Sequence, residues 1–190
     1  MCNAACIFWV LKNISESEIR DKRILEVGSM DVNGSPRLVI ERLEPSGYIG
    51  IDLAPGPGVD IVCKCEELVE RFGEESFDFI ISTCALEHIE DWKTSISNIK
   101  KVCKKKGYIL IIVPGKWPQH DYPHDYWRFS KDDMVYIFSD CKILKLNSDY
   151  QPGRDEKGNV APLSLTYIKC QKPDNFSEIN LDDFEVEGVS

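Results

Sequence analysis

The sequence predicts an α/β protein built on a doubly wound, mostly parallel sheet. Short apolar runs rich in Ile and Val recur along the chain, helical patterns separate them, and the longest runs are apolar throughout. Strands that alternate with helices give a parallel sheet with helices on both faces, and continuously apolar strands are typical of such buried sheets. Seven runs are expected to be strands, at residues 23–28, 48–52, 59–62, 77–83, 108–113, 143–146 and 163–170.

Each predicted strand has its own local signal. The first (RILEVG) ends in a glycine, and the second (YIGID) follows a Pro-Ser-Gly turn. The third is short, whereas the fourth (FDFIIST) and the fifth (YILIIV) are the continuous apolar runs. No clear helix separates the last two strands, so we expect them to pair antiparallel at one edge of the sheet.

Helical patterns fill the gaps between the strands. Ser35 and Ser130 are candidate N-caps, with Pro36 in the first helical position after Ser35. The clearest helix has Trp92 and Ile96 on one face and lysines near its carboxyl end, where the helix dipole favours cations. The expected helices cover residues 5–11, 36–43, 66–72, 90–104 and 131–138.

Length and charge indicate one domain with a short tail. We expect a single domain over residues 1–170, including an N-terminal helical extension over 1–22, and an acidic tail over 171–190. The tail carries six acidic residues and one lysine, so it holds −5 of the formal charge of −9, and we expect it to be solvated or partly ordered. The acidic balance argues against nucleic-acid binding.

Composition also bears on location. No apolar run approaches the roughly 20 residues of a membrane span. The amino terminus lacks the basic residue and cleavage site of a signal peptide. Eight dispersed cysteines without a CxxC pair indicate reduced thiols and a cytoplasmic protein.

Ligands of doubly wound sheets bind outside the carboxyl ends of the strands, so the residues there are the first candidates. After the first strand, Gly28 permits a tight turn and Gly34 lets the chain enter the next helix. The spacing is not that of the dinucleotide fingerprint GxGxxG. Asp52 ends the second strand, 24 residues after Gly28, where a carboxylate can accept two hydrogen bonds from a ribose diol. Such a carboxylate suits NAD as well as other adenosine cofactors.

Four motifs in this order carry a resemblance to a known family: Glu26-x-Gly28, Asp52, Phe77-Asp78-x-Ile80-Ile81 and Leu86-Glu87-His88. The chain resembles the class I S-adenosylmethionine-dependent methyltransferases, and most closely the small type-11-like methyltransferase domains, over about residues 24–170. The resemblance implies a seven-stranded Rossmann-like sheet with an antiparallel edge strand. It also implies S-adenosylmethionine as cofactor and methyl transfer by in-line displacement to a small molecule.

The resemblance further implies which residues bind the cofactor. Glu26 and Gly28 would contact its methionine part, Asp52 its ribose and Leu53 its adenine. The full set expected on this basis is Glu26, Gly28, Ser29, Asp31, Gly34, Asp52, Leu53, Cys65, Glu66, Ser82, Thr83 and Cys84. Two departures stand out. Met30 follows Ser29 where many members keep a second glycine, and Lys64 replaces an acid that many members use to cap the adenine amino group.

The segment after the fifth strand, residues 114–129, is the most unusual stretch. Its 16 residues hold three prolines, two of the three histidines and two of the four tryptophans, without a helical period. A loop of this length in a compact domain is usually functional or disordered, and its aromatic content argues against disorder. We expect it to cover the substrate. The candidate catalytic residues are His120, His124, Asp125 and His88, and the candidate substrate-binding residues are Trp117, Tyr122, Trp127 and Arg128.

Within this set, His124 or His120 would act as general base, oriented by Asp121 or Asp125. The same pairs also suggest a metal, but Pro123 prevents one helix from presenting both histidines, and no further ligands are evident unless His88 or a carboxylate joins. No metal is therefore expected.

Several alternatives stay open at this stage. Asp125 and Arg128 could form a purely structural ion pair while the aromatic residues of the loop pack on the core. The protein could bind S-adenosylmethionine or S-adenosylhomocysteine without catalysis, or it could be another nucleotide-binding α/β protein such as an NAD-dependent enzyme. The sequence specifies neither the acceptor nor the oligomeric state.

Overall fold

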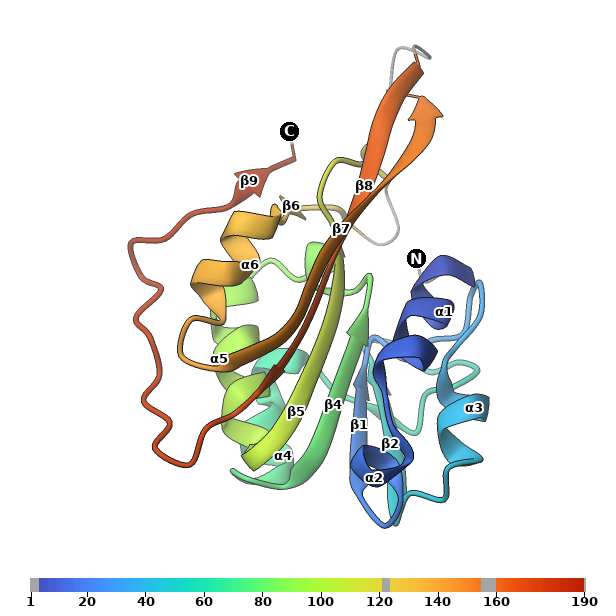
Figure 1. Ribbon diagram of the computed structural model, residues 1–190, viewed down its shortest axis with the longest axis vertical. Coiled ribbons are helices and arrows are strands. Elements are labelled where there is room, and N and C mark those ends of the chain that lie inside the picture. Colours follow the sequence, from blue (N-terminus) through green and yellow to red (C-terminus); the bar gives the residue numbers. More distant parts are fainter. Residues whose placement is uncertain (1–3, 121–123, 155–159, 190) are drawn as a thin grey trace.

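A computed structural model describes residues 4–120, 124–154 and 160–189 and shows a central sheet of seven strands (Figure 1). The strands lie in the order β3-β2-β1-β4-β5-β8-β7. Their bounds are Arg23–Val27 (β1), Gly47–Asp52 (β2), Ile61–Val62 (β3), Phe77–Thr83 (β4), Cys103–Pro114 (β5), Lys142–Arg154 (β7) and Val160–Gln171 (β8).

The strand directions confirm the predicted fold class. β3, β2, β1, β4 and β5 are parallel, whereas β8 runs antiparallel to both β5 and β7. The antiparallel hairpin therefore lies at one edge, with β8 one position in from the outermost strand. β7 and β8 are longer than predicted and extend beyond the rest of the sheet (Figure 1). The outer part of this hairpin pairs only with itself, so it lacks the apolar pattern of a buried strand.

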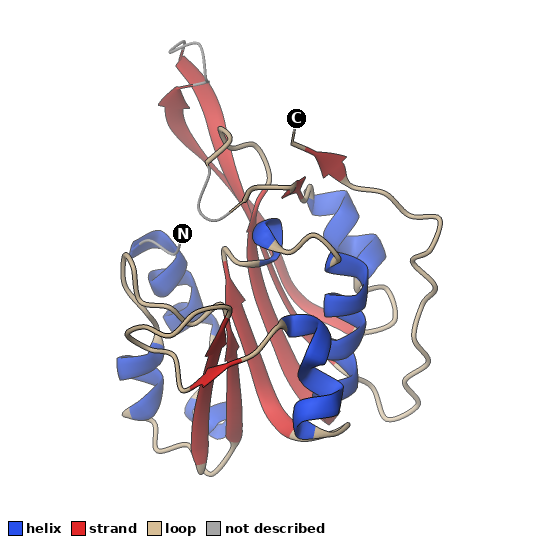
Figure 2. Ribbon diagram, turned by 180° about the vertical axis from the view of Figure 1, so that it is seen from behind, coloured by secondary structure: helices blue, strands red, loops and turns tan. Residues whose placement is uncertain are grey.

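Helices cover both faces of the sheet (Figures 1 and 2). One face carries α1 (Ala4–Asn13), α2 (Glu16–Ile19) and α3 (Arg37–Glu41). The other carries α4 (Leu68–Phe72), α5 (Trp92–Val102) and α6 (Lys131–Ile137), and 3₁₀ turns η1 (Cys65–Glu67) and η2 (Leu86–His88) precede α4 and α5. All five predicted helices are present, although the one at 66–72 is divided between η1 and α4. The short α2 lies within the expected N-terminal helical extension, although no separate helix was predicted there.

The N-terminal ends of α6 and α3 test the two predicted N-caps. Ser130 caps α6 as predicted, because its hydroxyl accepts a hydrogen bond from the Asp133 N–H and Asp133 bonds back to the Ser130 N–H. Ser35 is not the N-cap of α3: Pro36 occupies that position, and the Ser35 hydroxyl accepts the Arg37 N–H instead.

Two apolar clusters form the core, one on each face of the sheet. Leu25 and Val27 of β1 belong to the cluster under α4, α5 and α6, whereas Ile24 belongs to the cluster under α1 and α3. This division follows because successive side chains of a strand point to opposite faces. The two clusters thus hold the strands in place from both faces. Side chains just beyond the carboxyl ends of the strands are therefore available to contact a ligand.

The segment after β8, expected to be solvated or partly ordered, packs against the domain. Residues 172–189, which we call the C-terminal strap, run along the outside of α5 and α6 (Figure 1). Leu181 and Val186 are buried, and the ring of Phe184 stacks on Tyr136 with 4.3 Å between centroids. The strap ends in β9 (Glu187–Gly188), which pairs with β6 (Trp127–Arg128). The buried apolar side chains of the strap are isolated between acidic residues. Their spacing has no period, so the sequence does not predict that this segment packs on the domain.

Within the described ranges, every helix is too short or too polar to cross a lipid bilayer.

Candidate active site

The loop after β1 is closed by a glycine that no other residue could replace without strain. Gly28 has a φ of +74°, and a Cβ built on it would lie 2.3 Å from the Cβ of Ala85. Its N–H and that of Ser29 both donate to the Ile51 carbonyl, at 2.9 and 3.0 Å. The loop after β1 therefore lies directly against Ala85, the residue before η2.

Asp52, at the end of β2, has the features expected of a ribose-binding carboxylate. Its Oδ2 accepts the Met30 N–H at 3.0 Å and its Oδ1 accepts the Leu53 N–H at 2.7 Å. The side chain is only half-buried, and each carboxylate oxygen can accept a second hydrogen bond. Leu53 beside it is 52% exposed. A half-exposed carboxylate next to an exposed apolar side chain fits an adenosyl group.

The structure shows how Met30 fits in the loop after β1, where the resemblance implied a second glycine. The loop after β2 packs onto the loop after β1, with the Asp31 N–H donating to the Pro57 carbonyl at 2.8 Å. A Cβ on Gly58 would lie 2.5 Å from the Ser29 carbonyl oxygen, and a Cβ on Gly56 would lie 3.1 Å from the Met30 side chain. The glycines that let the two loops approach closely, Gly56 and Gly58, thus belong to the loop after β2.

Three other predicted cofactor residues have partners within the protein. Glu26 is buried and accepts a hydrogen bond from the Tyr48 hydroxyl at 2.7 Å. The Asp31 carboxylate accepts the Gly34 N–H at 2.8 Å and so closes a turn. Gly34 has a φ of +113° and lies against Ile7 of α1. Their contacts with a cofactor stay predictions.

The remaining predicted cofactor residues lie at the same edge of the sheet. Ser82, Thr83 and Cys84 are buried at the end of β4, and the Cys84 sulfur is 3.8 Å from that of Cys6. The backbone carbonyls of Cys65 and Glu66 accept hydrogen bonds from the Asn98 amide. Burial raises the pKa of the Cys65 thiol, which therefore stays protonated.

The turn η2 carries a buried acid that is unusual in having no partner. The Glu87 side chain is fully buried, and within the described residues neither carboxylate oxygen has a hydrogen-bond partner. Burial raises the pKa of Glu87 to about 7. The Glu87 carbonyl accepts the Tyr126 N–H at 2.8 Å, which ties η2 to the loop after β5.

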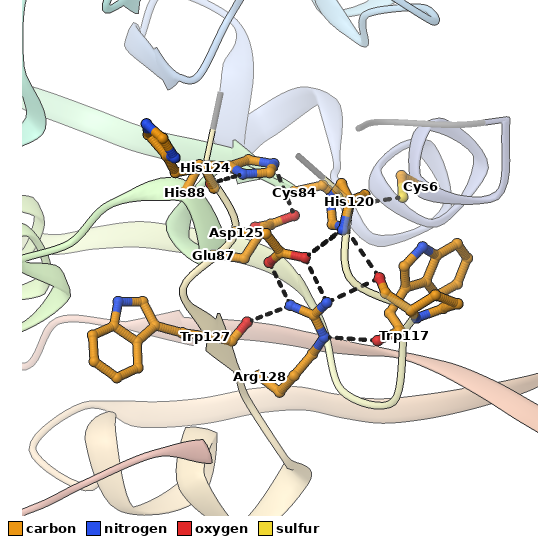
Figure 3. Close-up of polar contacts among 11 residues, drawn as sticks. Cys6, Cys84, Glu87, His88, Trp117, His120, His124, Asp125, Trp127 and Arg128 are labelled. Atoms are coloured by element: carbon orange, nitrogen blue, oxygen red, sulfur yellow. Dashed lines mark hydrogen bonds and ion pairs between the residues drawn. The ribbon is translucent and has the colours of Figure 1, made fainter. Parts of the chain in front are cut away.

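Two histidines from different segments join this acid (Figure 3). One potential ligand atom from each of Glu87, His88 and His120 lies within 4.8 Å of those of the other two. We call these residues the Glu87–His88–His120 cluster. The His88 and His120 rings are in edge-to-face contact, 4.9 Å apart between centroids. Burial lowers the pKa of both histidines, so both are mainly neutral at neutral pH.

Asp125 and Arg128 hold the loop after β5 in place. The Arg128 guanidinium donates to both oxygens of Asp125, at 2.5 and 2.6 Å, and also to the carbonyls of Trp117 and Pro118. Burial alone would raise the pKa of Asp125, but hydrogen bonds from Arg128 and the His120 N–H lower it. Trp127 donates its indole N–H to the Ile89 carbonyl at 2.9 Å. The geometry therefore favours the structural alternative for Arg128 and Trp127 over substrate binding.

The two histidines of the loop are not equivalent. The His120 ring lies beside the Asp125 carboxylate, with 2.8 Å between Nδ1 and Oδ2. His124 is exposed and points away from Glu87, so only its carbonyl oxygen reaches the cluster (Figure 3). Trp117 is half-buried against the core cluster under α1. The predictions for Tyr122 and Asp121 fall outside the described residues.

Glu87 is the functional candidate that sequence reasoning missed. In the sequence it stands only as part of the Leu-Glu-His motif, which does not reveal that this acid is buried without a hydrogen-bond partner among the described residues. Its position could have indicated a role, because Glu87 directly precedes His88 and follows a strand of a doubly wound sheet, where ligands bind.

The strand order, with a single antiparallel strand next to the edge and a polar site across β1 and β4, defines a Rossmann-like methyltransferase fold. Residues 25–111 match the model of the family described as "Methyltransferase domain". No curated protein matches the sequence.

Several solved structures have a similar fold. The YcgJ protein of Bacillus subtilis is 14% identical with a TM-score of 0.64, over 89% of this chain and 98% of that one. A SAM-dependent methyltransferase of Methanosarcina mazei is 16% identical with a TM-score of 0.61, over 87% and 97%. The 1,6-didemethyltoxoflavin-N1-methyltransferase of Burkholderia thailandensis, solved with 1,6-didemethyltoxoflavin and S-adenosylhomocysteine, is 16% identical with a TM-score of 0.59, over 90% and 76%.

Proposed function

We propose that this protein is an S-adenosylmethionine-dependent methyltransferase that methylates a small-molecule acceptor. The observation that carries the proposal is the contact of Gly28 with Ala85. It joins the loop that would hold the methyl donor to the turn that bears Glu87 and His88. Donor and acceptor groups therefore have adjoining places at the carboxyl edge of the sheet, as a direct transfer requires.

Two comparisons support the choice of cofactor and substrate class. The family match covers the strands that form the donor side of the site. The Burkholderia thailandensis enzyme was solved with S-adenosylhomocysteine and a small heterocyclic substrate, and its fold is similar to this one.

The donor side of the mechanism depends on binding alone. When bound, S-adenosylmethionine supplies a methyl group already activated by its sulfonium. Asp52 would accept hydrogen bonds from the ribose hydroxyls, and Leu53 would cover the adenine ring. The loop after β1, bent at Gly28, would hold the methionine part close to the end of β4.

The acceptor side depends on the Glu87–His88–His120 cluster. Its polar groups would orient the nucleophilic atom of the acceptor toward the donor. For an acceptor that carries a proton, His120 is the better placed general base, because Asp125 fixes its ring. His124 would not take that role, since its ring points away from the cluster.

The cysteines and the net charge bear on the cellular compartment and on the class of acceptor. We place the protein in the cytoplasm, because seven cysteines of the described residues are free thiols. The net charge of −9 favours a small or exposed acceptor over nucleic acid.

Calorimetric titration with S-adenosylhomocysteine tests the donor site. Wild-type protein should bind with measurable heat, and Asp52→Asn should bind at least about tenfold more weakly, because an amide keeps only one acceptor oxygen. Asp183→Asn, at an exposed position of the C-terminal strap, should bind like the wild type.

Transfer of labelled methyl from the donor to a metabolite extract then tests catalysis. Appearance of label in a small molecule supports the enzyme assignment. Binding without transfer in any extract favours a binding protein, and a lack of binding overturns the proposal.

A further inference from the structure

Three side chains with metal-ligand chemistry converge beside the end of β4. Glu87 and His88 come from η2, and His120 comes from the loop after β5, which has no helix or strand of its own at that point. Their potential ligand atoms all lie within 4.8 Å of one another. We propose that Glu87, His88 and His120 bind a divalent transition-metal ion of the zinc type.

The hydrogen bonds of the two imidazoles support this proposal. The Nδ1 of His88 lies 2.5 Å from the His124 carbonyl oxygen, and the Nδ1 of His120 lies 2.8 Å from Oδ2 of Asp125. Histidines that bind metals almost always donate the second ring N–H to a carbonyl or a carboxylate, which fixes the tautomer. Both rings therefore have Nε2 as the nitrogen left to bind a cation.

The state of Glu87 is the second, independent support. Its carboxylate is fully buried, and its oxygens have no hydrogen-bond partner among the described residues. The His88 ring lies nearby, with 3.9 Å between Nε2 and Oε1, but burial keeps that imidazole mainly neutral by lowering its pKa. A buried carboxylate without partners is costly, whereas a bound cation would satisfy it.

The cluster is also held in place by contacts that do not depend on an ion. The Tyr126 N–H bonds to the Glu87 carbonyl, and Arg128 clamps the Asp125 carboxylate that orients His120. The loop and the turn are therefore fixed relative to each other. Such preorganisation is what a metal site requires of its supporting residues.

The ligand set indicates the kind of metal. Two imidazoles and one carboxylate suit zinc or iron, whereas magnesium and calcium prefer oxygen ligands alone. In the sequence, His120 and His124 have no evident further ligands unless His88 or a carboxylate joins them. In the fold, His88 rather than His124 lies beside His120, and Glu87 supplies the third potential metal ligand.

Three protein ligands leave coordination positions open, as in catalytic metal sites. On the proposed function, those positions would take an oxygen of the acceptor, so the acceptor class would be a hydroxyl compound. With Nε2 of His120 bound to the metal, that ring would no longer act as general base. The metal would instead lower the pKa of that hydroxyl, whose proton goes to water. The acceptor oxygen would then bond to the methyl carbon as the carbon–sulfur bond breaks.

Nuclear magnetic resonance of the imidazole nitrogens in the wild-type protein gives the most direct test, because the chain has only three histidines. The protein is freed of metal with a chelator, kept in a reductant that does not bind metal, and titrated with Zn²⁺. One equivalent should shift the Nε2 resonances of His88 and His120 and leave those of His124 unchanged. No shift, or a shift of His124 alone, would overturn the proposal.

Titration with Co²⁺ and Zn²⁺ of matched variants adds a second readout. Glu87→Gln and His120→Ala should each weaken binding more than about 100-fold, since losing even an outer partner of a metal ligand costs 10–100-fold. His124→Ala should bind like the wild type. The Co²⁺ spectrum should lack the thiolate charge-transfer bands that binding by cysteine would produce. Such bands, or unchanged affinity in both ligand variants, would contradict the site.

These measurements contain neither donor nor acceptor, so they stand apart from the enzyme assignment. Zn²⁺ binding without methyl transfer would leave the metal site intact and overturn the proposed function. Methyl transfer by a protein that binds no Zn²⁺ would do the reverse.

Discussion

Arg128 and Asp125 face each other as a planar guanidinium and a planar carboxylate, joined by two parallel hydrogen bonds. They are three residues apart in the chain and both almost fully buried. The same carboxylate holds His120, so this ion pair links the packing of the loop to the polar cluster.

Replacement of Arg128 by Met should destabilise the protein by about 3–5 kcal/mol, because it leaves the Asp125 carboxylate buried without its cation. The free energy of unfolding in urea, measured at neutral pH, gives this difference. Arg42→Met alters an exposed arginine and should change it by no more than about 0.5 kcal/mol. Equal effects of both substitutions would show that the pair contributes nothing.

Gly28→Ala should reduce both stability and affinity for S-adenosylhomocysteine. The added Cβ would overlap Ala85 and sit on a backbone with φ of +74°, and overpacking of this kind costs about 1–3 kcal/mol. Urea denaturation and calorimetry measure the two effects. Gly47→Ala is the matched control, since its Cβ would meet nothing within 4 Å. The double variant Gly28→Ala/Ala85→Gly should recover part of the stability, and no recovery would argue against the overlap.

Lys100 and Asp140 form a second buried pair, 2.6 Å apart, between α5 and the turn after α6. Lys100→Met should cost about 3–5 kcal/mol, because it removes the cationic partner of a buried carboxyl side chain. Lys105→Met removes a half-exposed lysine and should change stability little. Replacing both partners, as Lys100→Met/Asp140→Leu, should be milder than the single change. A double variant as unstable as the single one would refute this account.

The stability contributed by Asp78 should depend on pH. Burial alone would raise its pKa, but hydrogen bonds from the Arg23 N–H and the Lys104 ammonium lower it. A carboxyl whose pKa is lower in the folded state stabilises the protein above its unfolded pKa of about 4, and loses that effect as the pH falls through its folded pKa.

Asp78→Asn should therefore be less stable than the wild type near pH 7, and the difference should shrink below pH 4. Urea denaturation at a series of pH values follows it, with the exposed Asp183→Asn as control. A difference that stays constant down to pH 2 would contradict the expected linkage.

The strand pattern was predictable because buried parallel strands have a strong signal. Runs such as those of β4 and β5 are apolar on both faces, and Asp52 and Gly28 lie where such strands end. The outer half of the β7–β8 hairpin escaped prediction because it pairs only with itself and lacks the apolar pattern of a buried strand. The C-terminal strap escaped prediction because its buried apolar side chains are isolated among acidic residues and show no period.

The sequence predicted the location of the site better than the roles of its residues. His120 and His124 look equivalent in the sequence, four residues apart and each followed by an aspartate. Only the fold shows that His120 turns toward Asp125 and that His124 turns outward. Likewise, the pairing of Glu87 with residues more than 30 positions away depends on how β4 and β5 lie side by side.

The strap has a consequence for synthesis on the ribosome. β9 pairs with β6, and the Val189 N–H bonds to the Tyr126 carbonyl, so residues 187–189 support the stretch that carries Asp125 and Arg128. The sheet from β1 to β5 can form while later codons are still being translated. The loop over the candidate site gains its last backbone partners only after these residues have emerged, so in a nascent chain the scaffold precedes the complete site.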